Sequence, residues 1–212
     1  MKNTPDNCPN CQIIFSGNYC HACGEKRFQS SDLRFTQVIA DISHSATDLD
    51  GKFLKSFKLL LLKPGQLTRD YLSGKRVSLL TPFRLFLFVN IIYFVVASLI
   101  GQNSFATHLS THLNATNFLH NELAQYIVNQ HVSETGISFK VLEQSFNDLV
   151  GVQAKVFVFL MIPMMALIVL LMGLKQKYAA ATAWVFSTHV FSMALLLFLV
   201  VSPMANYVVK LG

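Results

Sequence analysis

The sequence predicts a mainly α-helical, multi-span membrane protein with a small zinc ribbon at its N-terminus. Three observations predict this fold class: three long uncharged apolar segments, a basic polar N-terminal part, and four cysteines that all lie between Cys8 and Cys23. Hydrophobic residues make up 52% of the 212-residue chain and charged residues only 13%, whereas soluble domains are about 25% charged. An ordinary soluble protein is therefore not expected.

The charged residues divide the chain into two portions. Of 17 Lys and Arg residues, 12 lie at or before Arg84, and 7 of the 11 acidic residues lie at or before Asp70. A polar, basic portion is thus followed by an apolar, thinly charged one, as in proteins that join a membrane-surface part to a membrane part. We expect a zinc-ribbon module at 1–28, cytoplasmic membrane-interfacial helices at 29–84 and a transmembrane region at 85–212.

The four cysteines form the pattern C-x2-C-x8-C-x2-C, with Cys8 and Cys11 in the first pair and Cys20 and Cys23 in the second. Two residues between thiolates let a tight turn direct both sulfurs at one ion, and two such turns complete a tetrahedral shell that zinc or iron accepts. Residues 13–19 predict a hairpin that brings the pairs together. So small a module needs a structural metal, worth about 10–16 kcal/mol of apparent binding free energy for zinc.

Other interpretations of the cysteines fit less well. Two disulfides require an oxidising compartment, which conflicts with the cytoplasmic location that the charge pattern predicts. A redox-active C-x2-C would be expected beside a βαβ pattern, which is not recognisable here. Four sulfur ligands leave no open position for catalysis, and no nucleophile triad, phosphate loop or paired intramembrane acids can be recognised. We therefore predict that the protein is not an enzyme and assign no catalytic residue.

An apolar helical stripe connects the ribbon to the membrane region. Apolar residues recur at three- and four-residue steps from Phe35 to Leu61, and several lysines lie off this stripe. The stripe has two interpretations: a helix lying in the bilayer interface, with its lysines toward anionic headgroups, or a helix packed on the membrane bundle. Pro64-Gly65 ends this helix, and a second short helix is expected at 66–72.

Three segments are long and apolar enough to cross a membrane, for which about 20 residues are needed. These spans are expected at about 85–101, 156–174 and 179–201. The outer loop between the first two spans, 102–155, is expected to contain two amphipathic helices, the second from Phe139 to Val150. Lys and Arg flank the spans in the order basic, acidic, basic, which predicts a multi-pass protein with its N-terminus in the cytoplasm.

Part of the chain resembles a known family. The ribbon ends in CHACGEKR, and residues 63–88 read KPGQLTRDYLSGKRVSLLTPFRLFLF. With the double C-x2-C, the string PGxxxRxYLxGKRxxxxxPF resembles an uncharacterised, Bacteroidetes-type bacterial family of zinc-ribbon membrane proteins, described only as a domain of unknown function. The resemblance covers residues 8 to about 100 and implies a bacterial cytoplasmic (inner) membrane location. It also implies one structural unit that contains Pro64, Gly65, Arg69, Tyr71, Leu72, Gly74, Lys75, Arg76, Pro82 and Phe83.

Two groups of polar residues are further candidates. Arg69, Lys75 and Arg76 are placed to bind phosphate headgroups or an acidic partner surface, although plain positive-inside anchoring explains them too. Asn90 in the first span and His189 in the third form a candidate intramembrane polar site. The alternative for both is a neutral hydrogen bond between helices.

These observations favour a non-catalytic scaffold or regulatory protein in which the cytoplasmic zinc ribbon recruits a protein partner. The lipid bilayer is the other expected partner, and the pattern is compatible with a homo-oligomer. The alternative is a component of a small transporter or channel whose path is lined by Asn90 and His189. Nucleic acid is a poor candidate partner, because the ribbon itself carries few basic residues.

Overall fold

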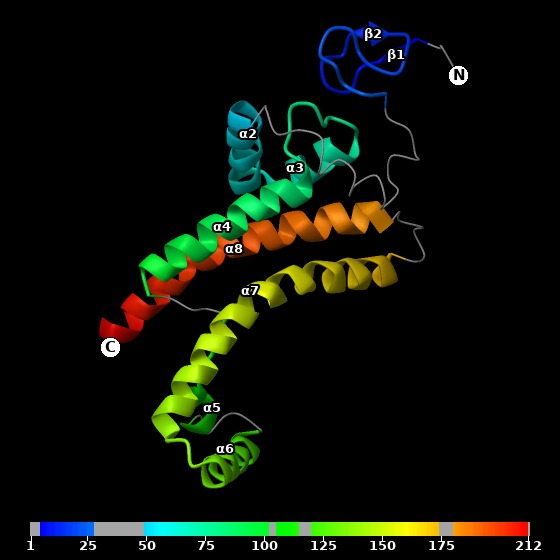
Figure 1. The fold of residues 1–212 in the computed structure, drawn as a ribbon. Coiled ribbons are helices and arrows are strands. Elements are labelled where there is room, and N and C mark those ends of the chain that lie inside the picture. The colour runs from blue at the N-terminus through cyan, green and yellow to red at the C-terminus, as the bar shows by residue number, and fades with distance from the viewer. Residues whose placement is uncertain (1–4, 28–48, 102–104, 115–119, 174–179, 212) are drawn as a thin grey trace.

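A computed structural model describes residues 5–27, 49–101, 105–114, 120–173 and 180–211 (Figure 1). The predicted fold class is confirmed in its main features, since the described chain is mainly helical and contains three helices that are long and apolar enough to cross a membrane. The four cysteines lie together in an N-terminal unit of two short strands and tight turns, residues 5–27, which we call the cysteine module.

The strands of the cysteine module differ from the predicted hairpin. β1 (Asp6–Asn7) pairs with β2 (Ile14–Phe15) in antiparallel register. Tyr19 does not return along β2 and instead forms a single bridge with Lys26. Each C-x2-C turn reverses the chain by itself, so each backbone pairing closes across one cysteine pair, and the predicted pairing of residues 13–15 with Tyr19 is wrong.

Two helices follow the segment that lies outside the described residues. α2 (Leu49–Leu62) and α3 (Pro64–Leu72) are separated at Lys63, as Pro64 predicts, because proline has no N–H to continue a helix and is favoured in the first turn of the next. Leu60 of α2 is fully buried in the main core, whereas Leu62 is 68% exposed. For residues 49–62 the apolar stripe therefore packs on the helix bundle on one side and leaves leucines outward on another. The part of the stripe from Phe35 to Ala46 lies outside the described residues.

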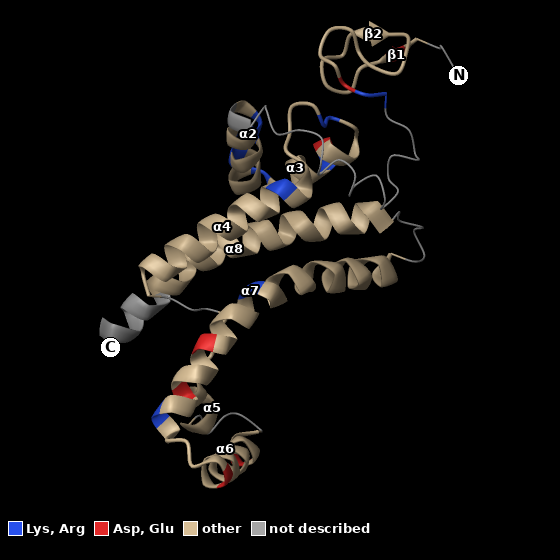
Figure 2. Cartoon of the chain, viewed as in Figure 1, with Lys and Arg blue, Asp and Glu red and all other residues tan. Residues whose placement is uncertain are grey.

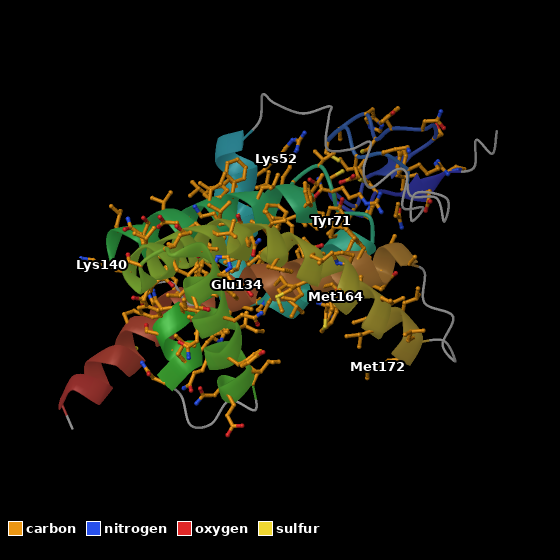
Figure 3. The ribbon with its side chains drawn as sticks, turned by 60° about the horizontal axis from the view of Figure 1, so that its bottom comes forward. Lys52, Tyr71, Glu134, Lys140, Met164 and Met172 are labelled. Atoms are coloured by element: carbon orange, nitrogen blue, oxygen red, sulfur yellow. The ribbon has the colours of Figure 1, made fainter. Side chains whose placement is uncertain are left out.

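The three candidate spans are α4 (Pro82–Leu99), α7 (Phe139–Met172) and α8 (Ala180–Leu211, candidate span Ala180–Met204). α4 and α8 lie side by side, and α7 follows α8 on the other side (Figure 1). Figure 2 shows long stretches of all three without charged residues. Met164 and Met172 are on the outward side of α7, 57% and 82% exposed (Figure 3), where apolar side chains require a cover such as lipid.

The predicted outer loop requires a correction. The expected loop helix from Phe139 to Val150 and the second span form one continuous helix of 34 residues, because Gly151 alone does not end a helix and no proline separates the two segments. Such a helix is about 51 Å long, well over the hydrocarbon thickness of about 30 Å. Its N-terminal half carries the charges and packs beside α5 (Leu109–Asn114) and α6 (Asn121–Thr135), far from the cysteine module (Figures 1 and 2).

One apolar core holds these helices together. Phe86, Val89 and Tyr93 of α4 are almost fully buried against α7 and α8, and the ring of Phe86 meets that of Phe159 edge to face. Leu67 and Tyr71 of α3 belong to the same core. α3 is therefore part of the bundle, and the loop after it, residues 73–81, is fixed at one end by α3 and at the other by α4.

Candidate functional site

The four cysteine sulfurs lie within 4.8 Å of one another and form no disulfide. The Sγ atoms of Cys8 and Cys23 are 3.5 Å apart, and those of Cys11 and Cys20 are 3.6 Å apart. Zinc–sulfur bonds of about 2.3 Å in a tetrahedron place the sulfurs about 3.8 Å apart. The donor set and its spacing thus fit one tetrahedral metal ion, and all four residues are those that the sequence pattern selected.

The two turns that carry the cysteines repeat the same backbone hydrogen bonds. The N–H of Cys8 donates to Ile13 O (3.0 Å) and the N–H of Gln12 to Cys8 O (2.9 Å). In the second turn Cys20 donates to Glu25 O (2.8 Å) and Gly24 to Cys20 O (2.9 Å). Gln12 and Gly24 hold equivalent places and both have left-handed backbones, with φ of 64° and 73°, a conformation that favours glycine.

Arg27 connects several parts of the cysteine module, including Asp6 of β1, whose Oδ2 lies 3.9 Å from Nη1. Its Nε donates to Gly17 O (2.8 Å), its Nη2 donates to Phe15 O (3.3 Å), and the guanidinium lies 4.9 Å from the centre of the Phe15 ring. Phe15 is 3% exposed and packs against Cys8 and Cys20. One arginine therefore ties the turn after β2 to the single aromatic residue in the small core.

The pKa values of two of the thiols, Cys23 and Cys11, are shifted in opposite directions. Burial acts to raise the pKa of Cys23, but hydrogen bonds from the Glu25 backbone, the Asn10 side chain and neighbouring thiols outweigh it and lower the pKa to about 7. At Cys11 the Ile13 backbone hydrogen bond lowers the pKa, whereas burial and the three other cysteines raise it, with a net value of about 12. Four thiolate charges at this spacing need a cation to be held together.

Glu25 joins the cysteine module to the loop between α3 and α4. Its side chain is 2% exposed, and Oε2 accepts hydrogen bonds from the backbone N–H groups of Arg76 and Val77, both at 2.9 Å. Charge-assisted bonds to two adjacent backbone donors are among the stronger hydrogen bonds in proteins. The carboxylate follows the last cysteine by two residues, so the second cysteine turn and the anchor of the module are nearly the same piece of chain.

Asn10 supplies a second connection between the same two parts. It lies inside the first cysteine pair, its amide donates to the Cys23 sulfur, and its Oδ1 accepts from the Ser78 hydroxyl at 3.1 Å. Groups that bond both a ligand and the surrounding protein orient metal ligands. Sequence analysis missed Glu25, Asn10 and Ser78 as functional residues; the one available signal was an acidic residue directly after the last cysteine turn in a basic segment.

The three candidate cations, Arg69, Lys75 and Arg76, have different surroundings in the structure. Lys75 pairs with Asp70 (Nζ to Oδ1, 3.1 Å), and the Arg76 guanidinium lies over the Tyr71 ring at 5.2 Å. Arg69 is exposed and lines a cavity between α3 and α8. Arg69 is thus the member of the set that faces a space large enough for a ligand.

His189 is buried in α8 and 2% exposed. Its Nδ1 lies 2.9 Å from Oγ1 of Thr68 on α3, and its ring meets that of Tyr71 edge to face. Asn90 is 7% exposed, and its Nδ2 has no hydrogen-bond partner among the described residues. No hydrogen bond joins Asn90 to His189 in the described chain, and a shared polar site of the two residues stays a prediction. His189 is bonded by a residue that the sequence placed outside the spans.

Comparisons with known proteins give one match. A family model described as a protein of unknown function (DUF3667) matches residues 50–94, which comprise α2 from its second residue, α3 and most of α4. The expected resemblance to a domain of unknown function is thus supported for the unit on which the cysteine module rests. No curated protein and no solved structure matches the chain significantly.

Proposed function

We propose that this protein is a non-catalytic membrane scaffold that holds a zinc-loaded ribbon at the cytoplasmic face, where the ribbon recruits a protein partner. The observation that carries the proposal is the anchored carboxylate of Glu25. A module fixed in this way presents one constant surface, so a partner that binds it loses less conformational entropy than one that must order a flexible module.

The surface that the module presents is apolar. Ile14 and Tyr19 are both 64% exposed and Ile13 is 45% exposed, although the module is small and polar elsewhere. Exposed aliphatic and aromatic side chains are typical of protein–protein contacts. These side chains stay exposed while Glu25 and Asn10 contact the loop 73–81, so a partner can bind them without displacing the module.

Zinc is the metal that the proposal assigns, because four thiolates in two short turns form a closed structural site of the kind that zinc occupies. The orientation rests on the basic residues before the first span and on the position of the α5–α6 region at the other end of the bundle. Metal analysis of the purified protein separates zinc from iron, and accessibility of a tag at the N-terminus in sealed vesicles tests the orientation.

The decisive experiment places a photo-crosslinking residue at Tyr19 in the full chain and compares native membranes of this protein with those of Cys8→Ser/Cys11→Ser. We expect about one zinc per chain and a crosslinked neighbour that disappears in the cysteine variant and in Ile14→Glu. A crosslinker at Leu123 on α6, 60% exposed at the opposite end, is the matched control and should capture different neighbours. The proposal fails if the Tyr19 neighbours are the same with and without metal.

A further inference from the structure

A cavity of about 820 Å³ lies between α3 and α8. Its α8 wall is formed by residues that share one helix face and that are apolar apart from His189, with Phe186 at one end and Leu197 at the other. These two residues are separated by about 16 Å along the helix, which is half of a hydrocarbon core of about 30 Å. Phe186 and Leu197 are 40% and 50% exposed, so the cavity is an open groove on the bundle. Its length and lining suit one acyl chain of one leaflet.

The groove also contains a cation. Arg69 lines it, is exposed, and has no acidic partner among the described residues. It follows Thr68, whose hydroxyl contacts His189, so the arginine and the histidine lie at the same end of the groove. An arginine beside an apolar groove matches a ligand that has an apolar chain and an anionic phosphate group.

The imidazole of His189 adds a further requirement. The Thr68 hydroxyl donates to the Pro64 carbonyl at 3.2 Å, the usual backward bond of a helical threonine. Its oxygen therefore accepts at 2.9 Å from Nδ1–H of His189, which leaves Nε2 as an unprotonated acceptor. This Nε2 is buried and has no hydrogen-bond partner in the described chain. Buried acceptors without a donor are costly. Nε2 is covered by its neighbours, so a ligand hydroxyl in the groove supplies the missing donor once the side chains over the imidazole move aside.

We propose that the groove between α3 and α8 is a binding site for an anionic glycerophospholipid with a hydroxyl-bearing headgroup, of the phosphatidylglycerol type. The acyl chain follows α8 toward Leu197, the phosphate binds Arg69, and a headgroup hydroxyl donates to Nε2 of His189. The inference does not depend on the partner proposed for the zinc ribbon. It explains why a residue of the third span and a cation before the first span are brought to one place.

The test uses the purified full-length protein reconstituted with three lipids of matched acyl chains in equal amounts, followed by native mass spectrometry of retained lipid. The lipids are phosphatidylglycerol, phosphatidylcholine and phosphatidylethanol, which is anionic but has no headgroup hydroxyl. We expect one retained phosphatidylglycerol, about tenfold in preference to phosphatidylcholine, because the choline ammonium offsets the attraction of the phosphate to Arg69 and the choline headgroup has no hydroxyl. Phosphatidylethanol should lie between them. Arg69→Gln should remove the preference for anionic lipid, and His189→Leu only the preference between the two anionic lipids.

Val190→Trp fills the groove from α8 and should abolish retention, whereas Val200→Trp, an exposed position on the same helix outside the groove, should retain the lipid. Leu197→Trp serves as a second groove-filling variant if Val190→Trp does not fold. Lys58→Gln, an exposed cation of α2 away from the groove, controls for loss of charge. Equal retention of the three lipids, or unchanged retention in both folded tryptophan variants of the groove, overturns the proposal.

Discussion

Thr68 and His189, 121 residues apart in sequence, are joined by a 2.9 Å contact between Oγ1 and Nδ1. Tyr71, one turn further along α3, meets the same imidazole edge to face, with ring centres 6.4 Å apart. A short polar helix that precedes the first candidate span is thus fixed to the N-terminal half of the third. The membrane-proximal helices and the spans form one structure. Substitutions in α3 are therefore expected to alter the packing of α8.

Replacement of Thr68 by valine should destabilise the protein. The side chains have similar shapes, but the variant leaves the Nδ1–H of His189 buried without an acceptor, which costs about 1–3 kcal/mol. Thermal unfolding of the purified protein should show the loss, and Thr68→Ser should recover most of it. In the double variant Thr68→Val/His189→Leu the penalty should largely disappear, because neither polar partner remains. Strictly additive losses would contradict the hydrogen bond.

Replacement of Glu25 by alanine should detach the cysteine module from the loop 73–81 without loss of metal. The N–H groups of Arg76 and Val77 lose their acceptor, so their hydrogen exchange should become faster, while the metal content stays at about one ion per chain. Lys26→Ala, next to it and exposed, is the control and should leave both amides protected. Slow exchange at residues 76 and 77 in Glu25→Ala would show that the carboxylate is not the anchor.

Removal of the metal should loosen the module first and its anchor second. A chelator is expected to accelerate exchange throughout residues 8–26. The module has a core of only Phe15 and the cysteines, and in the proposed zinc-bound state metal binding supplies much of its folding free energy. Exchange at Arg76 and Val77 should follow, since Glu25 lies two residues from Cys23. The amides of α4 and α8 should not change. Protection of residues 76 and 77 in the metal-free protein would refute this coupling.

Substitutions at Gly24 and Gln12, the two positions with left-handed backbones, should affect the metal affinity differently. Gly24→Ala forces a Cβ onto a backbone with φ of 73°, although nothing lies within 4 Å of that Cβ, so its cost is conformational, about 1–2 kcal/mol. Metal affinity, measured by competition with a chelator, should fall roughly five- to thirtyfold. Gln12→Gly relieves the same conformation in the first turn and should leave affinity equal or higher. A loss of affinity in Gln12→Gly would mean that its side chain has a role of its own.

Features governed by short-range patterns could be predicted from the sequence. Hydropathy located three candidate spans, and for α4 and α8 the predicted bounds agree with the observed ones to within a few residues. Proline located the boundary between α2 and α3, and cysteine spacing selected the four thiols. Each of these depends on residues close together in the chain. The start of α7 was misplaced because charge, which marks the edge of a membrane, does not mark the end of a helix.

Features that depend on distant residues could not be predicted. The partners of Glu25 are backbone N–H groups 51 and 52 positions away. Almost every residue type has a backbone N–H, so the residue types at these positions do not identify them as partners. His189 was recognisable as an unusual residue in an apolar segment, but nothing in the sequence selected Thr68 among the many hydroxyl residues before the first span. The hairpin was misassigned because the cysteine turns themselves act as hairpin loops, which apolar alternation does not reveal.

The separation between Glu25 and the amides it binds also sets an order for biogenesis. Protein synthesis proceeds from the N-terminus, so the cysteine module is complete, with all four ligands available, before the ribosome has made Arg76 or any residue of α4. The newly made module meets its loop only as the first hydrophobic helix enters the membrane. Capture of the loop by Glu25 therefore coincides with insertion of α4, and chains made under metal starvation would reach this step without a formed module to receive the loop.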